Sequence, residues 1–298
     1  MSSAKFLARY RIGDCERFRL RDHDPADTGG MKLDKGEAKA MLVDDAKRLG
    51  DLQDRLYAED KWAVLVVLQG MDTAGKDGVI RHVMDGVNPQ GCIVHPFKAP
   101  SAEEIDHDFL WRAALRLPER GRIGIFNRSY YEEVLVVRVH QDLIARQKLP
   151  QTLAGKDIWK ERFKSIRAFE RHLSRSGTLV LKFFLNISKE EQRRRLLARL
   201  DEPAKRWKFN AGDIEERKLW DQYMSVYEDM IRATSSEHAP WYVVPADNKP
   251  FARLVVARAI VEALSALDLK FPKVGDEDLK VMAKIRQALA AEGGKIRR

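Results

Sequence analysis

The fold is decided by residues 62–78, which read WAVLVVLQGMDTAGKDG. The first part, 63–68, is short, apolar and rich in β-branched residues, which is typical of a strand covered on both faces. It leads directly into Gly70, Gly75 and Lys76, which match the pattern G-x-x-x-x-G-K. A strand, a glycine-rich loop and a helix in this order predict a loop that binds phosphate groups.

The residue types of this loop suit phosphate binding. Glycines let successive backbone N–H groups turn inward onto phosphate oxygens. The helix that begins near Lys76 adds its positive dipole end, and the lysine supplies a mobile point charge. The alternative is a tight strand-to-helix turn with an incidental lysine, but the strand context favours phosphate binding. The expected phosphate contacts in the loop are Gly70, Thr73, Ala74, Gly75, Asp77 and Gly78.

Two acidic residues depart from the usual phosphate loop. Asp77 stands where a Ser or Thr hydroxyl normally binds Mg²⁺, and Asp72 lies inside the loop, where it would repel phosphate unless a cation lies between them. We infer that Asp72 helps to hold Mg²⁺, with Asp77 as a second candidate ligand. The alternative for Asp77 is a first-turn carboxylate favoured by the helix dipole.

Further strands and helices alternate along the chain. This alternation predicts an α/β fold with a doubly wound parallel sheet of about five strands flanked by helices. The other strands are expected at 92–97, 122–126, 178–185 and 241–244. The helices are expected at 35–60, 76–87, 102–117, 130–146, 157–175, 189–200, 213–233 and 251–267.

The sequence divides into three expected regions. Residues 1–60 form an irregular N-terminal arm, 1–33, followed by a helix that Asp34 caps and that packs on the core. Residues 61–270 form the kinase core, with the lid at about 189–212. Residues 271–298 form a C-terminal helix with a basic tail, for which the simplest interpretation is a solvated or frayed end.

Composition narrows the function classes. Hydrophobic residues make up 44% and charged residues 33% of the 298 residues, which excludes a wholly disordered or collagen-like chain. Lys and Arg exceed Asp and Glu by 54 to 45, a net charge of +9, which favours an anionic partner. Two cysteines, Cys15 and Cys92, and no apolar run of membrane-spanning length predict a cytoplasmic protein without a disulfide framework.

A second segment, 122–133, is expected to meet the phosphate loop. In P-loop proteins the strand beside the loop strand usually ends in an acid that reaches Mg²⁺, and Asn127 takes that place here. Arg128 follows it and should point into the crevice at the carboxyl ends of the strands. Glu132 and Glu133 begin the next helix, where they could hold a second metal, orient a phosphate, or serve only as first-turn helix acids.

The region 189–208 is the candidate lid. It has eight basic and four acidic residues, and Arg195 and Arg199, four apart, share a helix face that Arg194 neighbours. Nucleotide kinases place a closing lid with phosphate-binding arginines at this point. The alternative is a solvated helix with internal ion pairs such as Glu191 with Arg195. Lys98, just after a strand, is expected to face the same crevice.

Together these segments resemble the polyphosphate kinase 2 family. The resemblance covers roughly residues 20–268. It implies a P-loop kinase fold with a helical lid and reversible, Mg²⁺-dependent phosphoryl transfer between inorganic polyphosphate and a nucleotide. The main matching segments are 70–78, 126–132 and 207–210, and the supporting ones are 88–91, 97–101, 106–112 and 241–247.

The resemblance also implies residue roles. Asp72, Lys76 and Arg128 match the catalytic core, and Lys98, Lys208 and the lid arginines match polyphosphate contacts. Asp72 and Glu132 are the implied ligands of Mg²⁺, for which Mn²⁺ is a substitute. The segments 106–111 and 131–133, with Glu132 at the position that differs between subgroups, further resemble the subgroup that acts on both AMP and ADP. The implied partners are polyphosphate, adenine or guanine nucleotides and further copies of the chain, with no membrane and no specific nucleic acid.

Two other functions stay open on the sequence alone. One is an ATP-dependent nucleoside monophosphate kinase on the same fold. The other is a basic nucleic-acid-binding protein that uses the phosphate loop only for docking, although the sequence contains no recognised nucleic-acid motif. Formation of ATP from ADP and polyphosphate without added ATP would separate a polyphosphate-dependent kinase from the ATP-dependent one. Tight duplex binding without phosphoryl transfer would support the nucleic-acid-binding protein.

Overall fold

A five-stranded parallel sheet forms the centre of the molecule, as the alternation of strands and helices predicts. The structure, a computed structural model, describes residues 3–13, 15–31 and 35–293. The strand order is β2-β3-β1-β4-β5. The strands are β1 Ala63–Gln69, β2 Cys92–Pro96, β3 Ile123–Asn127, β4 Thr178–Asn186 and β5 Trp241–Pro245.

The position of β1 decides where a site can form. All seven of its residues are buried, and Val66 pairs with Ile125 of β3 on one side and with Leu181 of β4 on the other. The loop after β1 therefore opens at the centre of the sheet's carboxyl edge, where the strand order reverses. Open α/β sheets bind ligands at this point.

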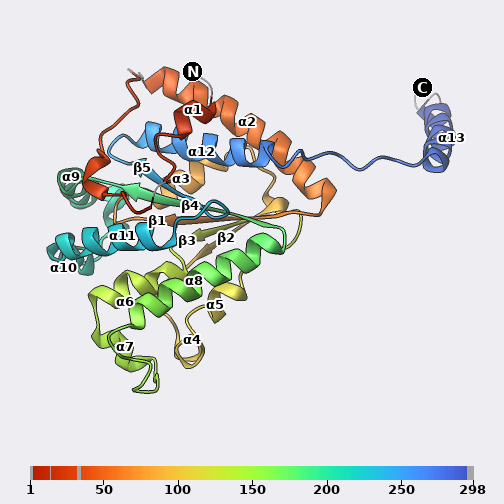
Figure 1. The fold of residues 1–298 in the computed structure, drawn as a ribbon. Helices are drawn as coiled ribbons and strands as arrows, with labels where there is room; N and C mark the ends of the chain where they lie inside the picture. The colour runs from red at the N-terminus through yellow and green to blue at the C-terminus, as the bar shows by residue number, and fades with distance from the viewer. Residues whose placement is uncertain (1–2, 14, 32–34, 294–298) are drawn as a thin grey trace.

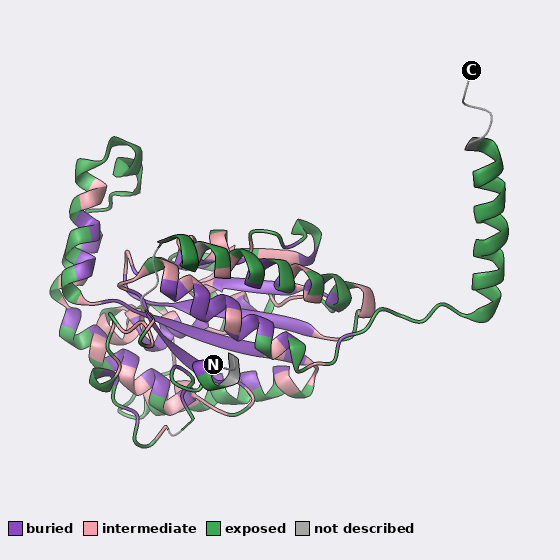
Figure 2. Cartoon of the chain, turned by 90° about the horizontal axis from the view of Figure 1, so that it is seen from above, coloured by how far each residue is buried: buried purple, intermediate pink, exposed green. Residues whose placement is uncertain are grey.

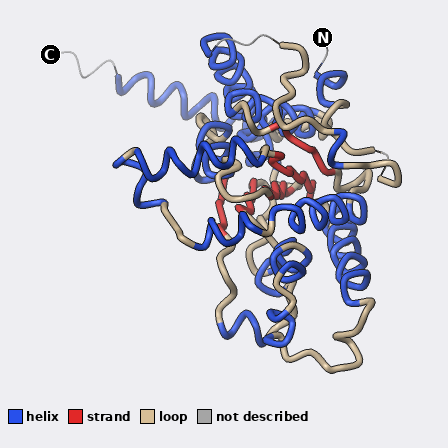
Figure 3. The backbone as a smooth tube through the Cα atoms, turned by 90° about the vertical axis from the view of Figure 1, so that its left-hand side faces the viewer, coloured by secondary structure: helices blue, strands red, loops and turns tan. Residues whose placement is uncertain are grey.

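Helices cover both faces of the sheet (Figures 1 and 3). One face carries α1 Ser3–Leu7, α2 Lys35–Glu59, α3 Lys76–Val83 and α12 Lys249–Ser265. The other carries α8 Ile158–Arg175 and α11 Trp220–Thr234. The remaining short elements are η1 Leu20–Asp22, η2 Pro89–Gly91, α4 Ala102–Asp106, α5 Trp111–Ala114, η3 Tyr130–Val134, α6 Val136–Val139 and α7 Asp142–Arg146. A projecting arm contains α9 Lys189–Asp201, η4 Pro203–Lys208 and α10 Gly212–Lys218.

Several helices expected to be continuous are interrupted. The expected helix 102–117 breaks because His107 is extended and the Asp108 carboxylate accepts from the backbone N–H of Leu110 at 2.9 Å. The expected helix 130–146 becomes η3, α6 and α7, since Leu135 and His140 leave the helical region. The expected helix 213–233 is split between α10 and α11 at Leu219. At His107 the side-chain hydrogen bond of Asp108 competes with the helix, and at Leu135, His140 and Leu219 tertiary context overrides the helical pattern.

Residues 3–13 and 15–31 are mostly irregular, but they include two short helices and pack on the core. They contain α1, and Phe6, Tyr10 and Phe18 are buried in the core. The backbone N–H of Val243 donates to the carbonyl of Tyr10 at 2.9 Å, so the arm lies along β5 and shields that edge of the sheet. The capping residue Asp34 and the basic end 294–298 lie outside the described residues.

The helix α13 Asp276–Gly293 stands apart from the body (Figure 2). All of its described side chains are exposed, as the prediction of a solvated end expects. Within the described ranges, no helix combines the length and the apolar character that crossing a bilayer requires.

The N-terminal arm makes a testable contribution to stability. The Phe6 ring is 3% exposed and packs edge-on against Tyr10 and Phe251. We expect Phe6→Ala to lower the free energy of unfolding by about 3–5 kcal/mol, measured by urea denaturation. The matched control is Phe271→Ala, since that ring is 60% exposed and its loss should change stability by less than about 0.5 kcal/mol. Equal effects of the two variants would contradict the buried placement of the arm.

Candidate active site

The loop after β1 has the backbone of an anion cradle. Gly70 and Gly75 have positive φ values of 151° and 111°, and a Cβ on Gly70 would lie 2.9 Å from the carbonyl oxygen of Leu185. Thr73 also has a positive φ, 66°, which a β-branched residue adopts only under strain. Its buried hydroxyl has no hydrogen-bond partner among the described residues. Strain and an unsatisfied donor at one position are typical of a loop shaped for a ligand.

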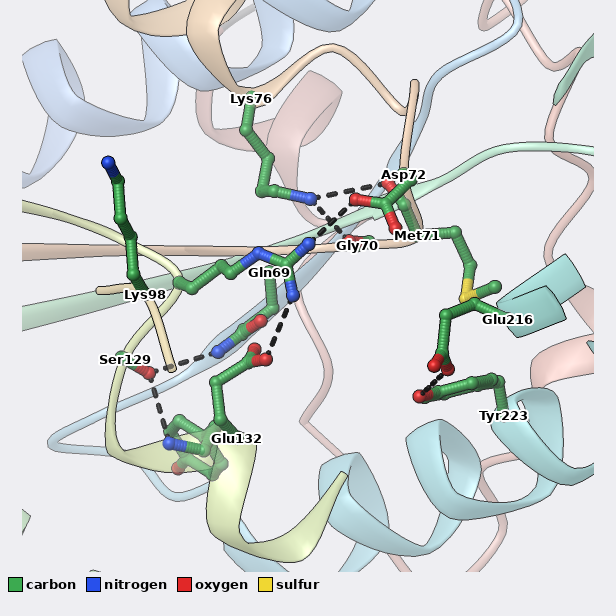
Figure 4. A network of polar contacts seen from close by, with 12 residues as sticks. Gln69, Gly70, Met71, Asp72, Lys76, Lys98, Ser129, Glu132, Glu216 and Tyr223 are labelled. Atoms are coloured by element: carbon green, nitrogen blue, oxygen red, sulfur yellow. Dashed lines mark hydrogen bonds and ion pairs between the residues drawn. The ribbon is translucent and has the colours of Figure 1, made fainter. Parts of the chain in front are cut away.

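Lys76 lies inside this loop rather than on the surface. Its Nζ donates to the carbonyl oxygens of Gly70 at 2.5 Å and Met71 at 3.2 Å (Figure 4). Burial, and next the nearby Arg128 guanidinium, lower the pKa of Lys76 to about 8. The ammonium group is therefore poorly solvated and would gain from an anion placed in the loop.

Arg128 connects two carboxylates. Its backbone has a φ of 62°, and its guanidinium donates to Asp72 Oδ1 at 2.6 Å and to Glu132 Oε2 at 3.0 Å. The charge of Glu132 is the largest of the causes that raise the pKa of Arg128. Asp72 accepts from Nη2 of this guanidinium and Glu132 from Nη1. The structure thus brings together the three residues expected to act on phosphate and metal at the centre of the site.

The other two expected acids lie nearby but pair with other side chains. Asp77 accepts a hydrogen bond from the Asn127 side-chain amide at 2.8 Å, which joins the start of α3 to the end of β3. Glu133 turns away from Glu132 and pairs with Arg162 at 2.9 Å. Burial raises the pKa of Glu133. Adjacent residues of η3 therefore have different surroundings, which the sequence pattern does not distinguish.

The three arginines of α9 that were expected to bind phosphate also separate. Arg195 is buried, and its guanidinium donates to the carbonyls of Thr73, at 3.0 Å, and Ala246, at 2.6 Å. It therefore clamps the phosphate loop to the end of β5. Arg199 pairs with Asp213 at 2.8 Å, whereas the Arg194 side chain is 73% exposed on the outer side of the helix.

A cationic cavity of about 460 Å³ opens over the phosphate loop. Three of its basic residues were not among the expected phosphate contacts: Lys205 from η4, and Lys249 and Arg253 from α12. Lys249 begins the helix after β5, so applying the carboxyl-edge rule to that strand would have found it. Its pKa is lowered by burial and then by the charge of Arg195. The basic lining is Lys76, Lys98, Arg128, Arg195, Arg199, Lys205, Lys208, Lys249 and Arg253, and the acidic lining is Asp72 and Asp77.

A second cavity, of about 510 Å³, lies next to the first. Its walls are largely apolar and come from the segment after β2, from α4 and from η3 to α7. Phe97, Lys98 and Arg128 line both cavities, so the two meet at Arg128. The apolar lining is Phe97, Ile105, Phe109, Val136, Val137 and Leu143. Charged side chains, among them Arg112, Arg128 and Glu132, lie between these apolar walls. A pocket of this size with both apolar surface and charged groups suits an organic ligand that also carries charge, rather than a bare phosphate chain.

The arrangement can bring two anionic reactants together. One cavity presents cations and main-chain N–H groups, and the other presents apolar walls that end at Arg128 and Glu132. A phosphate group at their junction would meet Lys76 and Arg128, which can offset charge that spreads over a transferring phosphoryl group. Carboxylates at Asp72 and Glu132 lie at the same junction.

Comparisons with known proteins agree with this geometry. The sequence model of the family described as polyphosphate kinase 2 matches residues 32–272. A Rhodopseudomonas palustris protein named ADP-polyphosphate phosphotransferase is 50% identical over 282 residues, covering 94% of this chain and 97% of its own. A Meiothermus ruber protein named AMP/ADP-polyphosphate phosphotransferase is 47% identical over 267 residues, covering 90% of this chain and 96% of its own.

A solved structure agrees as well. The crystal structure of polyphosphate kinase 2 from Arthrobacter aurescens superimposes with a TM-score of 0.86 at 40% sequence identity. The superposition covers 96% of this chain and 97% of that one.

The lowered pKa of Lys76 predicts a pH dependence of anion binding. Below about pH 8 the ammonium is charged, and above it the free protein must take up a proton to bind an anion. We expect the Kd of tripolyphosphate, measured by calorimetry without metal, to rise by up to about tenfold per pH unit above pH 8.

The control for this experiment is Lys76→Arg, which stays charged throughout and reports the ionisation of tripolyphosphate itself. The Kd of the wild type divided by the Kd of Lys76→Arg should therefore rise only above pH 8. Parallel profiles for wild type and variant would contradict a titrating Lys76.

Proposed function

The chain belongs to the polyphosphate kinase 2 family, and from this premise we propose that it transfers a phosphoryl group reversibly between inorganic polyphosphate and an adenine or guanine nucleotide. The observation that carries the proposal is that Arg128 lines both the cationic and the apolar cavity. A phosphoryl group moving from one ligand to the other would pass this guanidinium.

The cationic cavity is the proposed site of the phosphate chain. Polyphosphate carries about one charge on each phosphate, so a wall of lysines and arginines with the phosphate loop at its end is complementary to it. Lys249 and Arg253 extend this wall beyond the residues that the sequence motifs contain. Their pKa values are lowered, with burial as the largest cause, so a bound polyanion would relieve repulsion among cations that already exists.

The apolar cavity is the proposed site of the nucleotide. Phe97 and Phe109 offer ring surface to a base, while Lys98 and Arg128 stand where its phosphate end would approach the first cavity. An ionised phosphate oxygen of the nucleotide is already a nucleophile. It would attack the terminal phosphorus of the chain, and the bond to the bridging oxygen would break, leaving polyphosphate shorter by one unit.

The residues supply positioning and electrostatics rather than proton transfer. Lys76 and Arg128 would offset charge on the transferring group, and the clamp of Arg195 on the loop keeps the N–H groups aimed at it. We propose that α9, η4 and α10 act as a lid, since Arg199, Lys205 and Lys208 line the cationic cavity from this arm. Arg194 is exposed and paired with Glu191, so it would contact bound polyphosphate only after the lid closes.

Asp72 and Glu132 are the proposed ligands of Mg²⁺ or Mn²⁺. Among the described residues no cluster of three or more metal-ligating side chains occurs. Two carboxylates beside a phosphate site nevertheless fit Mg²⁺, which proteins commonly bind through one or two carboxylates together with substrate phosphates and water. When bound, the ion would polarise the phosphoryl oxygens and neutralise their charge.

Substrate range is the next level of the proposal. The two relatives named above differ, since one name gives ADP and the other gives AMP and ADP. We propose that this chain accepts both, because Glu132 resembles the AMP- and ADP-using subgroup. We also propose that the protein is cytoplasmic, which the free thiols of Cys15 and Cys92 fit. We propose further that it assembles as a homo-oligomer. Light scattering after gel filtration tests the assembly.

One assay tests the function. The protein is incubated with ADP, long-chain polyphosphate and Mg²⁺, without ATP, and ATP is measured by luciferase. ATP is expected, and with AMP in place of ADP both ADP and ATP are expected by chromatography. Absence of ATP from ADP, combined with phosphorylation of AMP by added ATP, would instead identify an ATP-dependent nucleoside monophosphate kinase.

Variants of the junction test the roles of its cations. We expect Lys76→Ala and Arg128→Ala each to lower kcat by about 10²–10³-fold, or about 3–4 kcal/mol, because each removes charge stabilisation of the transferring group. Arg120→Ala is the control, since Arg120 is exposed and lies before β3 at the opposite edge of the sheet. Turnover of either junction variant at the level of Arg120→Ala would show that its side chain plays no part in transfer.

A further inference from the structure

A fully buried ion pair lies in the core beneath the site. Lys182 of β4 is 0% exposed, and its Nζ donates to Glu170 Oε2 of α8 at 2.7 Å. The same Nζ donates to the Tyr131 hydroxyl at 2.9 Å and to the carbonyl of Thr234, at the end of α11, at 2.8 Å. All three donors of the ammonium group are therefore used.

The partner carboxylate is equally well satisfied. Glu170 Oε1 accepts from the hydroxyls of Tyr130 at 2.9 Å and Tyr131 at 2.7 Å. Burial, followed by the charge of Glu170, raises the pKa of both tyrosines well above 10, so both hydroxyls keep their protons and donate. The network joins two rigid helices and a central strand to two consecutive residues of η3.

The short helix η3 needs such an anchor. It has only five residues, and 3₁₀ turns of this length have weak hydrogen bonds of their own. It follows Arg128, whose backbone is left-handed, and Ser129, whose backbone is extended. Its two tyrosines point into the core, while the next residue, Glu132, holds Arg128 at 3.0 Å at the edge of the apolar cavity. A displacement of the tyrosines would move Glu132 with them.

Stability alone does not account for a charged pair at this depth. Two desolvated charges cost free energy, and well-packed apolar residues of similar volume commonly replace buried pairs without loss of stability. What an apolar core does not supply is a directional bond to each tyrosine hydroxyl. A fully satisfied polar network sets the position of its members more narrowly than apolar packing does.

We propose that Lys182 and Glu170 are positioning residues for the nucleotide cavity, which act through Tyr130 and Tyr131 to hold Glu132 against Arg128. The inference rests on the proposed function, because it assigns the nucleotide to the cavity that η3 lines. It makes a prediction that general stabilisation of the core does not. Loss of the network should impair nucleotide use more than polyphosphate use, because Glu132, which it positions, lines only the apolar cavity, whereas Asp72 still holds Arg128 in the cationic one.

The first test variant is Tyr131→Phe, because Tyr131 lines neither cavity and the change removes its hydroxyl while keeping its ring. Tyr130 lines the apolar cavity itself, so Tyr130→Phe is added only in a second, double variant. We expect KM for ADP to rise and kcat to fall by about tenfold, because small displacements of positioning groups are costly. We expect KM for polyphosphate to change by less than about twofold. If the double variant does not fold, the Tyr131→Phe result alone decides, with the same asymmetry expected.

The matched control is Tyr242→Phe. Tyr242 is also a buried tyrosine, 6% exposed, but it lies on β5 against Phe183 and the N-terminal arm. We expect this variant to lower Tm while leaving both KM values unchanged.

The outcomes separate the two proposals. Absence of ATP formation by the wild type overturns the proposed function. An active wild type with variants that raise both KM values together, or that lower only Tm, overturns the positioning role. A selective rise in KM for ADP supports it.

Discussion

Repulsion between like charges is the constraint on which this structure depends. Nine basic side chains line one cavity at the carboxyl edge of the sheet, and burial places several of them where water shields them poorly. Burial first, and then the charge of a neighbouring arginine, lowers the pKa of Lys76, Lys249 and Arg253. Such a cluster is stable only because carboxylates offset part of the charge, as Asp72 and Glu132 do on either side of Arg128. A polyanionic substrate would complete the neutralisation.

The backbone around this cluster is held in place by side chains from distant parts of the sequence. Thr73 and Arg128 adopt left-handed conformations that cost free energy and persist only where the surroundings enforce them. Arg195 supplies this for the phosphate loop through the carbonyls of Thr73 and Ala74, and Gln192 donates to the carbonyl of Asp72 at 3.2 Å. Both side chains come from α9. The first helix of the proposed lid therefore also holds the phosphate loop.

Each of the two cavities suits one of the two proposed reactants. A phosphate chain and a nucleoside have opposite requirements, one for cations and the other for apolar surface. The structure places these surfaces side by side and leaves a single guanidinium, that of Arg128, common to both together with Lys98 and Phe97. Transfer in either direction would then need no rearrangement of the core. The same residues would stabilise the group whether it leaves the chain or the nucleotide.

The sequence by itself determined the five strands, their parallel sheet and the phosphate loop, because apolar β-branched runs and a glycine pattern are local signals. It also placed Asp72, Lys76 and Arg128 correctly at the ends of neighbouring strands, since parallel strands end at one edge. Only the tertiary structure decided which side chains face the site. Helix phase separates Arg195 from Arg194. Glu132 and Glu133 line the same cavity, but Glu132 pairs with Arg128 and Glu133 with Arg162. Contacts between segments far apart in the chain, which no local pattern contains, decided the rest: the burial of Phe6, Leu7, Tyr10 and Ile12, the breaks at His107 and Leu219, and the contribution of Lys249 and Arg253.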